Sequence, residues 1–341
     1  MKLFFLDSLT HIALGACMGE AVAGKQLGRK AMVAGLIAHS LPDIDFLASL
    51  WLGTADNLHA HRGFTHSILF VLLISPLLAF IIRWVIKKDN LSFRRWLILF
   101  LVISGLHIFL DAFNNYGVGW FEPFSDYRIS FNSIYVVDPF FSIMPGIAAV
   151  MLIFIKHGRR ARRFWWITGL TFSFLYLGYC MVNKIIIDKR VEQILVNKSI
   201  PVKRFMTTPA PLQSWLWFIA AETDTGFYTG YISVFDRKRN TDLYFFPKND
   251  NLFLLVSNKE EAQKLVDFSQ GYFTFEQHTD TILINDLRFG QITGWHDPRQ
   301  RFAFHYYLQP ETDNTLAVQR GRFANWNKET FRSFIRRIKG N

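Results

Sequence analysis

Pairs of histidine and aspartate side chains recur along the N-terminal part of the chain at spacings that suit metal binding. His39 precedes Asp43 by four residues, and His107 precedes Asp111 by four residues. Because a helix turns once every ~3.6 residues, this spacing places both side chains on one helix face. The sequence therefore predicts metal ligands on several helices. The candidates are Asp7, His11, His39, Asp43, Asp45, His61, His66, His107, Asp111 and Asp138.

These candidates offer nitrogen and oxygen donors only. The two cysteines, Cys17 and Cys180, both lie in apolar segments, so no thiolate zinc site or disulfide framework can be built from them. Imidazole and carboxylate donors suit Zn, Mn, Fe or Co. The candidates outnumber the ligands of one tetrahedral ion, so we expect two divalent ions, with Zn favoured and Mn or Fe as alternatives.

Two-metal sites commonly catalyse hydrolysis, because one ion acidifies a bound water and both ions stabilise charge on the reacting oxygens. A carboxylate that is not consumed as a ligand can act as a general base, and Asp45 is our catalytic candidate for this role. Arg62 is the second catalytic candidate: it would bind an anionic substrate or, equally well, pair with a ligand aspartate. We therefore expect hydrolysis of an ester or phosphoester.

Some of the candidates also have a purely structural interpretation. Asp7 suits the start of the first helix, and Asp138, followed by Pro139, suits a helix N-cap. His11 lies on a Gly- and Ala-rich helix, where it would serve equally as a hydrogen-bonded packing residue. The 39–45 segment is harder to explain in this way, because two carboxylates and an imidazole in an apolar segment are costly without a cation.

The composition is that of a membrane protein. Hydrophobic residues make up 50% of the chain and aromatic residues 16%, including 35 Phe and 10 Trp. The formal net charge is +11, but much of the excess lies in short loops between apolar runs and in the C-terminal tail. Such clusters orient membrane helices and contact anionic headgroups. We therefore expect membrane lipids as partners and no nucleic acid, whereas the sequence does not identify a protein partner.

Apolar runs predict a multi-pass helical bundle. We expect six membrane-spanning helices, with the first two packed inside the bundle because they are interrupted by the polar candidates. Amphipathic surface helices are the alternative for these two. The six ranges are Leu3–Ala23, Ala31–Leu52, Ser67–Ile86, Trp96–Ala112, Ile134–Ile155 and Phe164–Val182.

The basic loops orient this bundle. Lysine and arginine concentrate in three alternate loops, 25–30, 87–95 and 156–163, which the positive-inside rule assigns to the cytoplasm. With that orientation, every candidate ligand lies toward the outer face of the membrane. Random placement would scatter the ligands over both faces, so their convergence predicts a single site.

The sequence changes character after Lys184, so we predict a transmembrane metal-binding domain at 1–184 and a soluble, mainly β (α+β) domain at 185–341, outside the cytoplasm. The stretch Lys259–Phe268 is expected to form a short helix. Strand-like alternation is seen in Trp215–Ala220, Gly226–Phe235, Asp242–Phe246, Thr281–Ile284, Gly290–Trp295 and Phe302–Leu308.

The N-terminal part resembles a bacterial family of membrane-bound metal-dependent hydrolases, typified by LexA-regulated, predicted hydrolases of the inner membrane. The resemblance covers residues 1–185 and is carried by four ordered motifs, DSLTHIALG (7–15), HSLPDID (39–45), HRGFTHS (61–67) and HIFLD (107–111). The segment Trp120–Asp138, which contains Glu-Pro-Phe-Ser, is similar to the next block of the family. The resemblance implies a bacterial inner-membrane hydrolase with an undefined substrate, and it does not extend to the β domain.

Two other classes of function compete with hydrolysis. A metal transporter or sensor would place polar groups along both halves of a path, whereas the inner half here offers little beyond Glu20. A structural membrane protein would use the metal to brace the bundle and the β domain to bind a partner.

Because the ligands lie near headgroup depth, the expected substrate of the hydrolase is a lipid or a lipid-linked phosphoester.

Overall fold

The computed structural model describes residues 2–85, 91–237, 241–278, 281–308 and 326–340, except for the side chains of residues 2–7. The chain divides into two compact units. Unit 1 comprises Met1–Ala48, Ala60–Phe131 and Val136–Tyr179, and unit 2 comprises Ser49–His59, Asn132–Tyr135 and Cys180–Asn341. The last boundary falls within one long helix, α7 (Arg160–Asn197).

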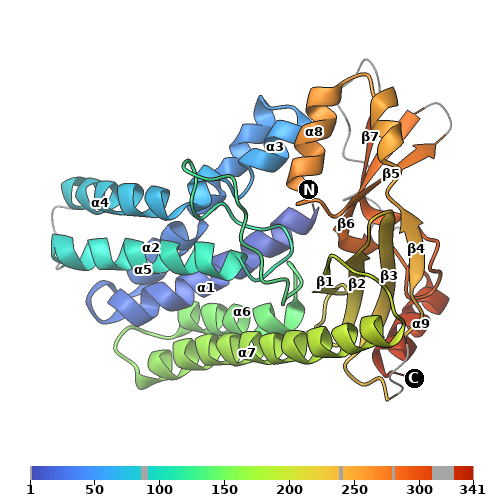
Figure 1. Ribbon diagram of the computed structural model, residues 1–341. Helices are drawn as coiled ribbons and strands as arrows, with labels where there is room; N and C mark the ends of the chain where they lie inside the picture. The colour runs from blue at the N-terminus through green and yellow to red at the C-terminus, as the bar shows by residue number, and fades with distance from the viewer. Residues whose placement is uncertain (1, 86–90, 238–240, 279–280, 309–325, 341) are drawn as a thin grey trace. The chain divides into compact units, whose positions relative to one another are not determined.

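Unit 1 is a bundle of helices (Figure 1). Its main helices are α1 (Lys2–Leu27), α2 (Arg29–Ser40), α4 (Ile68–Val85), α5 (Phe93–Asp111), α6 (Pro139–Phe154) and the first part of α7. Helix α1 packs against α2, α5 and α6, and α5 also packs against α2 and α4. Two short 3-10 helices, η1 (Pro42–Leu50) and η2 (Phe64–His66), follow α2 and precede α4.

Glycines bring α1 and α2 into close contact. A Cβ added at Gly15 would lie 2.7 Å from the Gly35 carbonyl oxygen, and a Cβ added at Gly35 would lie 2.6 Å from Gly19 Cα. Any larger side chain would therefore force the two backbones apart. Small residues are the usual means of close helix packing in membranes, where neighbouring helices gain from van der Waals contact. The close approach positions the polar side chains of α1 beside those of α2.

The expected count of six spans is not confirmed. Within the described residues, three helices are long and apolar enough to cross a membrane, namely α4, α5 and α7. Helix α2 and η1 make a fourth candidate if they count as one span, although they are bent by 56° where Pro42 begins η1. Proline lacks an N–H and clashes with the preceding turn, which explains the break. Helix α6 has only 16 residues, fewer than the ~20 that a span requires.

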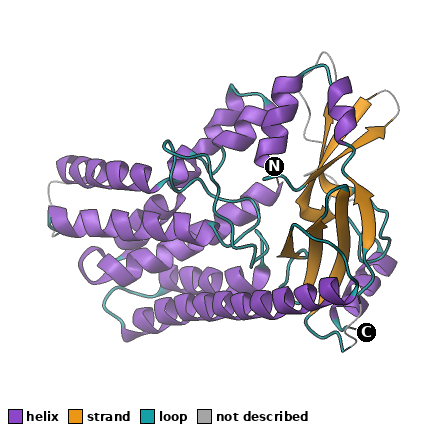
Figure 2. Cartoon of the chain, viewed as in Figure 1, coloured by secondary structure: helices purple, strands orange, loops and turns teal. Residues whose placement is uncertain are grey.

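Unit 2 contains two antiparallel sheets, drawn in orange in Figure 2. The first sheet has the order β1-β2-β3-β4, and the second has the order β5-β6-β7. Both follow the chain order, so each strand pairs with its sequence neighbour. The strands are β1 (Arg204–Pro209), β2 (Leu216–Glu222), β3 (Gly226–Ser233), β4 (Tyr244–Pro247), β5 (Phe273–His278), β6 (Thr281–Gln291) and β7 (Phe302–Leu308). The helices of this part are α3 (Thr54–Ala60), η3 (Asp250–Leu255), α8 (Lys259–Phe268) and α9 (Lys328–Ile338).

Strand β2 is buried on both faces and lies at the centre of unit 2. Its alternate residues point to opposite sides, so Phe218 joins one apolar cluster and Trp217 and Ile219 join another. The second cluster includes Ile187 and Val191 from the C-terminal part of α7. This double burial explains why the segment is an almost unbroken apolar run in the sequence.

The helix expected at Lys259–Phe268 is α8, with the same bounds. Five of the six expected strands correspond to β2, β3, β4, β6 and β7. The expected strand at Gly290–Trp295 is wrong, because only its first two residues belong to β6 and the rest form turns. Strands β1 and β5 were not expected, and the β4 segment is shorter than its alternation suggests.

Candidate metal centre

Four side chains from η1, η2 and α5 converge at one point, and each offers a ligand atom within 4.8 Å of the other three. His66 Nε2 lies 3.1 Å from His107 Nε2 and 3.4 Å from Asp111 Oδ2. Asp43 Oδ1 lies 3.6 Å from His66 Nε2 and 3.5 Å from His107 Nε2. His107 Nε2 lies 3.6 Å from Asp111 Oδ2. We call these residues the four-residue group.

The local structure explains how these side chains meet. His107 and Asp111 lie one turn apart on α5, so both project from the same helix face. Asp43 comes directly after Pro42, where the chain bends from α2 into η1. His66 ends the short helix η2, which fixes its position just before α4 begins.

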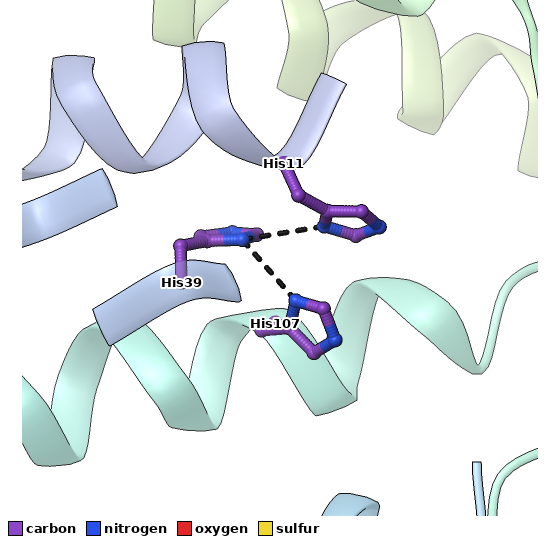
Figure 3. A group of neighbouring side chains, drawn as sticks. All are labelled: His11, His39 and His107. Carbon is purple, nitrogen blue, oxygen red and sulfur yellow. Dashed lines mark hydrogen bonds between the residues drawn. The ribbon is translucent and has the colours of Figure 1, made fainter. Parts of the chain in front are cut away.

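Three histidines from three different helices form a second group, which adjoins the first (Figure 3). His11 comes from α1, His39 from α2 and His107 from α5. His39 Nδ1 lies 3.2 Å from His11 Nδ1 and 3.3 Å from His107 Nδ1. We call these residues the three-histidine group, and its existence depends on the close approach of α1 and α2.

Two residues connect the groups. His107 faces the three-histidine group with Nδ1 and the four-residue group with Nε2. Asp111 has one oxygen in the four-residue group, and its other oxygen, Oδ1, lies 3.3 Å from His11 Nε2. The two groups are therefore one continuous buried network of nitrogen and oxygen donors.

Asp45 lies behind His66. Its Oδ2 is 3.3 Å from His66 Nδ1 and accepts a 2.7 Å hydrogen bond from the backbone N–H of Arg62. Its Oδ1 is 3.3 Å from His61 Nδ1, and the Thr65 hydroxyl donates to Oδ2 at 3.4 Å. A carboxylate on the far nitrogen of a ligand histidine fixes the orientation and tautomer of the ring. These contacts make Asp45 a residue that orients His66, and it belongs to neither ligand group, in contrast to the ligand and base roles expected from the sequence.

Arg62 is buried, with 1% of its surface exposed. Its Nε lies 3.2 Å from Asp111 Oδ2, and its guanidinium carbon lies 5.2 Å from the centre of the Tyr116 ring. Its φ of 58° is in the left-handed region, which is uncommon for a residue with a side chain. Of the two roles expected for Arg62, the structure shows the pairing with a ligand aspartate.

Two further predicted ligands, His61 and Asp138, lie outside both groups. His61 contacts Asp45 from the side away from His66, and it is half-buried. Asp138 is the N-cap of α6: it accepts a 2.9 Å hydrogen bond from the Phe140 N–H and another from the Tyr176 hydroxyl. The backbone of Asp7 belongs to α1, but its side chain lies outside the described residues.

The loop after α5 supplies contacts that no sequence pattern indicated. Arg128 is buried and donates to the His61 and Gly117 carbonyl oxygens at 3.0 and 3.4 Å. Tyr116 lies under the Arg62 guanidinium. These residues carry no period or pairing in the sequence, so only the presence of polar groups in a long loop between apolar runs could have suggested them.

Among the described side chains of the two groups, Asp43 is the most exposed. The Asp43 side chain is 25% exposed, whereas His66, His107 and Asp111 are at most 4% exposed. His11 and His39 are buried as well. A molecule from outside would therefore reach the four-residue group past Asp43.

Comparison with known proteins identifies the family. The family model described as YdjM inner membrane protein matches residues 6–187, more than half of the chain and the whole of both ligand groups. The Bacillus subtilis (strain 168) protein YfhP is 28% identical over 312 residues, which cover 83% of this chain and 87% of that protein. The Escherichia coli (strain K12) inner membrane protein YbcI is 38% identical over 123 residues, 35% of this chain and 69% of that protein.

No solved structure matches the chain. The apolar helices of unit 1 agree with a location in the inner membrane. On this evidence the chain belongs to the YdjM inner membrane protein family.

Proposed function

We propose that the protein is a membrane-embedded, metal-dependent hydrolase that cleaves an ester or phosphoester at the outer face of the bacterial inner membrane. The observation that carries the metal part of the proposal is the spacing of the donor atoms in the four-residue group. Five of the six distances between its donor atoms are known, and they run from 3.1 to 3.6 Å. A tetrahedral zinc ion with ligands at its usual bond lengths separates them by about 3.4 Å.

A bound cation explains the close approach of the three histidines better than hydrogen bonds between their rings do. Three imidazole Nδ1 atoms converge, and His39 Nδ1 contacts the other two. Each nitrogen of a neutral imidazole has either one N–H or one lone pair, so one such atom cannot satisfy two good hydrogen bonds. A divalent ion would accept a lone pair from every ring, and with both ions bound His107 would have to be deprotonated to imidazolate. Among the described residues three side chains would hold this ion, one fewer than in a closed structural zinc site.

In this proposal the chain holds two ions; the donor chemistry favours zinc, with manganese or iron as alternatives. When bound, the ions supply Lewis-acid charge and acidify water at neutral pH. Asp45 holds His66 in its orientation through Nδ1. Arg62 neutralises part of the Asp111 charge and places a cation beside the reacting centre.

The surroundings of the centre favour an amphiphilic substrate. The loop after α5 exposes Phe121, Phe124 and Tyr127, with 48%, 83% and 69% of their surfaces accessible. Phe64, two residues before the ligand His66, is 42% exposed. Tyrosine is typical of the membrane–water interface, and the exposed phenylalanines add apolar surface beside it. A lipid or lipid-linked phosphoester would place its acyl chain among them and its headgroup ester at the metal centre.

One observation favours a different function. All four positions of the four-residue group are filled by side chains, as in structural zinc sites. A structural membrane protein braced by metal is therefore the second candidate. Transport is less favoured, because Glu20 is engaged by Arg162 in a two-point ion pair, at 2.7 and 2.6 Å, and is not available along a path.

The proposal is tested first by elemental mass spectrometry on the detergent-purified protein. We expect two ions in the wild type, loss of one in Asp43→Ala and in His39→Ala, and loss of both in His107→Ala. The matched control is Asp138→Asn, which removes a buried carboxylate of unit 1 outside both groups and should keep both ions. A wild type that binds no metal even after ions are added back would overturn the proposal.

Activity separates the enzyme from the structural protein. The metal-loaded wild type is assayed against p-nitrophenyl esters, p-nitrophenyl phosphates and phospholipid vesicles. Hydrolysis that disappears in Asp43→Ala and persists in Asp138→Asn supports the enzyme. A wild type that retains two ions and cleaves none of these bonds supports the structural role.

A further inference from the structure

A turn in the loop after α5 is fastened on both sides of the ligand His66. The Gly119 N–H donates to the Arg62 carbonyl oxygen at 2.9 Å, and the Ile68 N–H donates to the Trp120 carbonyl oxygen at 3.0 Å. Arg62 and Ile68 flank η2, the short helix that ends at His66. The turn is therefore held against the ligand segment by the backbone, independently of any side chain.

The same turn positions the carboxyl group of Glu122. The Glu122 N–H closes the turn by donating to the Gly119 carbonyl oxygen at 3.1 Å. Its side chain then folds back over Gly119: a Cβ added there would lie 2.5 Å from Glu122 Oε1 and 2.9 Å from Cδ. Only glycine leaves room for this arrangement. The carboxyl group thus rests on the residue that is bonded to Arg62.

The surroundings of Glu122 differ from those of the other acidic groups near the centre. No hydrogen bond or ion pair of the described residues includes its carboxyl group, and the groups that act on it through their charge are Arg128, Asp126 and His66. The side chain is half-buried. Burial raises the pKa of Glu122, the charge of Asp126 adds to this rise, and the charge of Arg128 offsets it only in part.

We propose that Glu122 is the general acid of the hydrolytic reaction, a role that rests on the function proposed above. Asp43 and Asp111 are occupied as ligands, and Asp45 is occupied by its four contacts. Glu122 is the carboxyl group of the turn that is left for proton transfer, and the backbone joins this turn to both sides of the segment that carries His66.

The proton transfer is as follows. Water adds to the phosphorus or carbonyl carbon, and the bond from that atom to the leaving oxygen breaks, with its electron pair going to oxygen. The protonated Glu122 carboxyl group gives its proton to this oxygen, which leaves as an alcohol. The attacking water loses a proton to solvent, and Glu122 is then reprotonated from solvent. The sum is one ester and one water converted to one acid and one alcohol.

The decisive variant is Glu122→Gln, which keeps the size of the side chain and removes the proton. A leaving alkoxide needs a proton, whereas p-nitrophenolate leaves without one. We therefore expect Glu122→Gln to lose about 10²- to 10⁴-fold in kcat/KM on an alkyl phosphoester and to stay near the wild type on the matching p-nitrophenyl phosphoester. The matched variant is Asp126→Asn, which removes an exposed acid of the same loop that acts on Glu122 through its charge. It should leave the rate on the p-nitrophenyl substrate unchanged and move the pH dependence on the alkyl substrate to lower pH, without the loss expected for Glu122→Gln.

The pH dependence gives a second kinetic measurement. Because the acid must be protonated, the wild-type rate on the alkyl substrate should fall as pH rises through the pKa of Glu122. That limb should be absent in Glu122→Gln. An equal loss on both substrates, or no loss on either, would overturn the role of Glu122 while leaving the hydrolase proposal intact. A wild type that is inactive on both substrates would instead overturn the hydrolase.

Two measurements do not depend on activity. Metal content should be the same in the wild type and in Glu122→Gln, because Glu122 is not a ligand. Infrared spectra recorded as pH is lowered should differ between the wild type and Glu122→Gln by the carbonyl band of one protonated carboxyl group, present only in the wild type. Loss of metal in the variant would show that Glu122 supports the centre structurally and would overturn the acid role.

Discussion

Asp45 shows how a buried carboxylate can support a candidate metal centre from outside its groups of donor atoms. Its oxygens accept hydrogen bonds from the Arg62 backbone N–H and the Thr65 hydroxyl. They also contact the imidazoles of His61 and His66, and of these two only His66 belongs to the four-residue group. The Arg62 backbone that donates to Asp45 is held in a left-handed conformation. The left-handed φ of Arg62 is therefore backbone strain that accompanies the hydrogen bond from its N–H to the Asp45 carboxylate.

Asp45→Asn should weaken metal binding without abolishing it. The amide can still contact the neighbouring donors but cannot accept on both sides, so His66 loses its fixed tautomer. We expect the affinity to fall about 10- to 100-fold, as is usual for partners behind a metal ligand. Competition with a fluorescent chelator measures this fall. An affinity equal to that of the wild type would show that the orientation of His66 does not depend on Asp45.

The ligands on helices could be predicted at this scale, whereas the residues around them could not. His107 and Asp111 share a helix face by spacing alone, and the structure brings them together in one group. Spacing cannot distinguish a ligand from a residue behind it, and for this reason Asp45 was expected as a ligand. Glu122 was noted only as part of the Glu-Pro-Phe-Ser stretch and was given no role, because its position depends on hydrogen bonds between a loop and a distant segment.

At the scale of elements, α1, α6 and α7 are joined by a buried ion pair. Arg162 donates to both Glu20 oxygens through Nε and Nη2, and its Nη1 donates to the Leu152 and Ile155 carbonyl oxygens at 2.7 Å. Those carbonyls end α6, where helical acceptors have no partners of their own. The Arg162 guanidinium thus supplies donors to the last carbonyl oxygens of α6 and, through Glu20, fixes the position of α1.

Glu20→Ala should destabilise unit 1 by about 3–5 kcal/mol, because it leaves the Arg162 charge buried without its partner. Thermal unfolding in detergent measures the loss. The double variant Glu20→Leu/Arg162→Met removes both charges and should recover part of the stability, although the α6 carbonyls lose their donor. A single variant as stable as the wild type would contradict the assigned role of the pair.

The boundaries of these elements were predicted unevenly, for physical reasons. Amphipathic α8 has a strong helical period and a capping Asn258, and its bounds were predicted correctly. Strand β1 was not predicted, because it follows the long helix α7 without a clear alternation and pairs only with β2. We predicted the number of membrane spans from hydropathy alone. Hydropathy does not reveal the 56° bend between α2 and η1 at Pro42.

At the scale of the whole molecule, the proposal depends on which side of the membrane each loop occupies. A reporter enzyme fused after residue 200 should be active outside the cytoplasm, because three basic loops are assigned to the inside. A fusion at residue 90, within a basic loop, is the internal control and should report the cytoplasm. The opposite pattern would move the metal centre to the inner face and change the pool of substrates available to it.

The burial of the three-histidine group has a further consequence for how the protein is made. His39 and His107 have no exposed surface, and His11 has 4%. An ion bound between them could exchange with the medium only when α1, α2 and α5 separate, so exchange would be as slow as local unfolding. The metal would then be selected once, during biogenesis. Its identity in a purified sample would record the ions present when the helices assembled, and later dialysis would barely alter it.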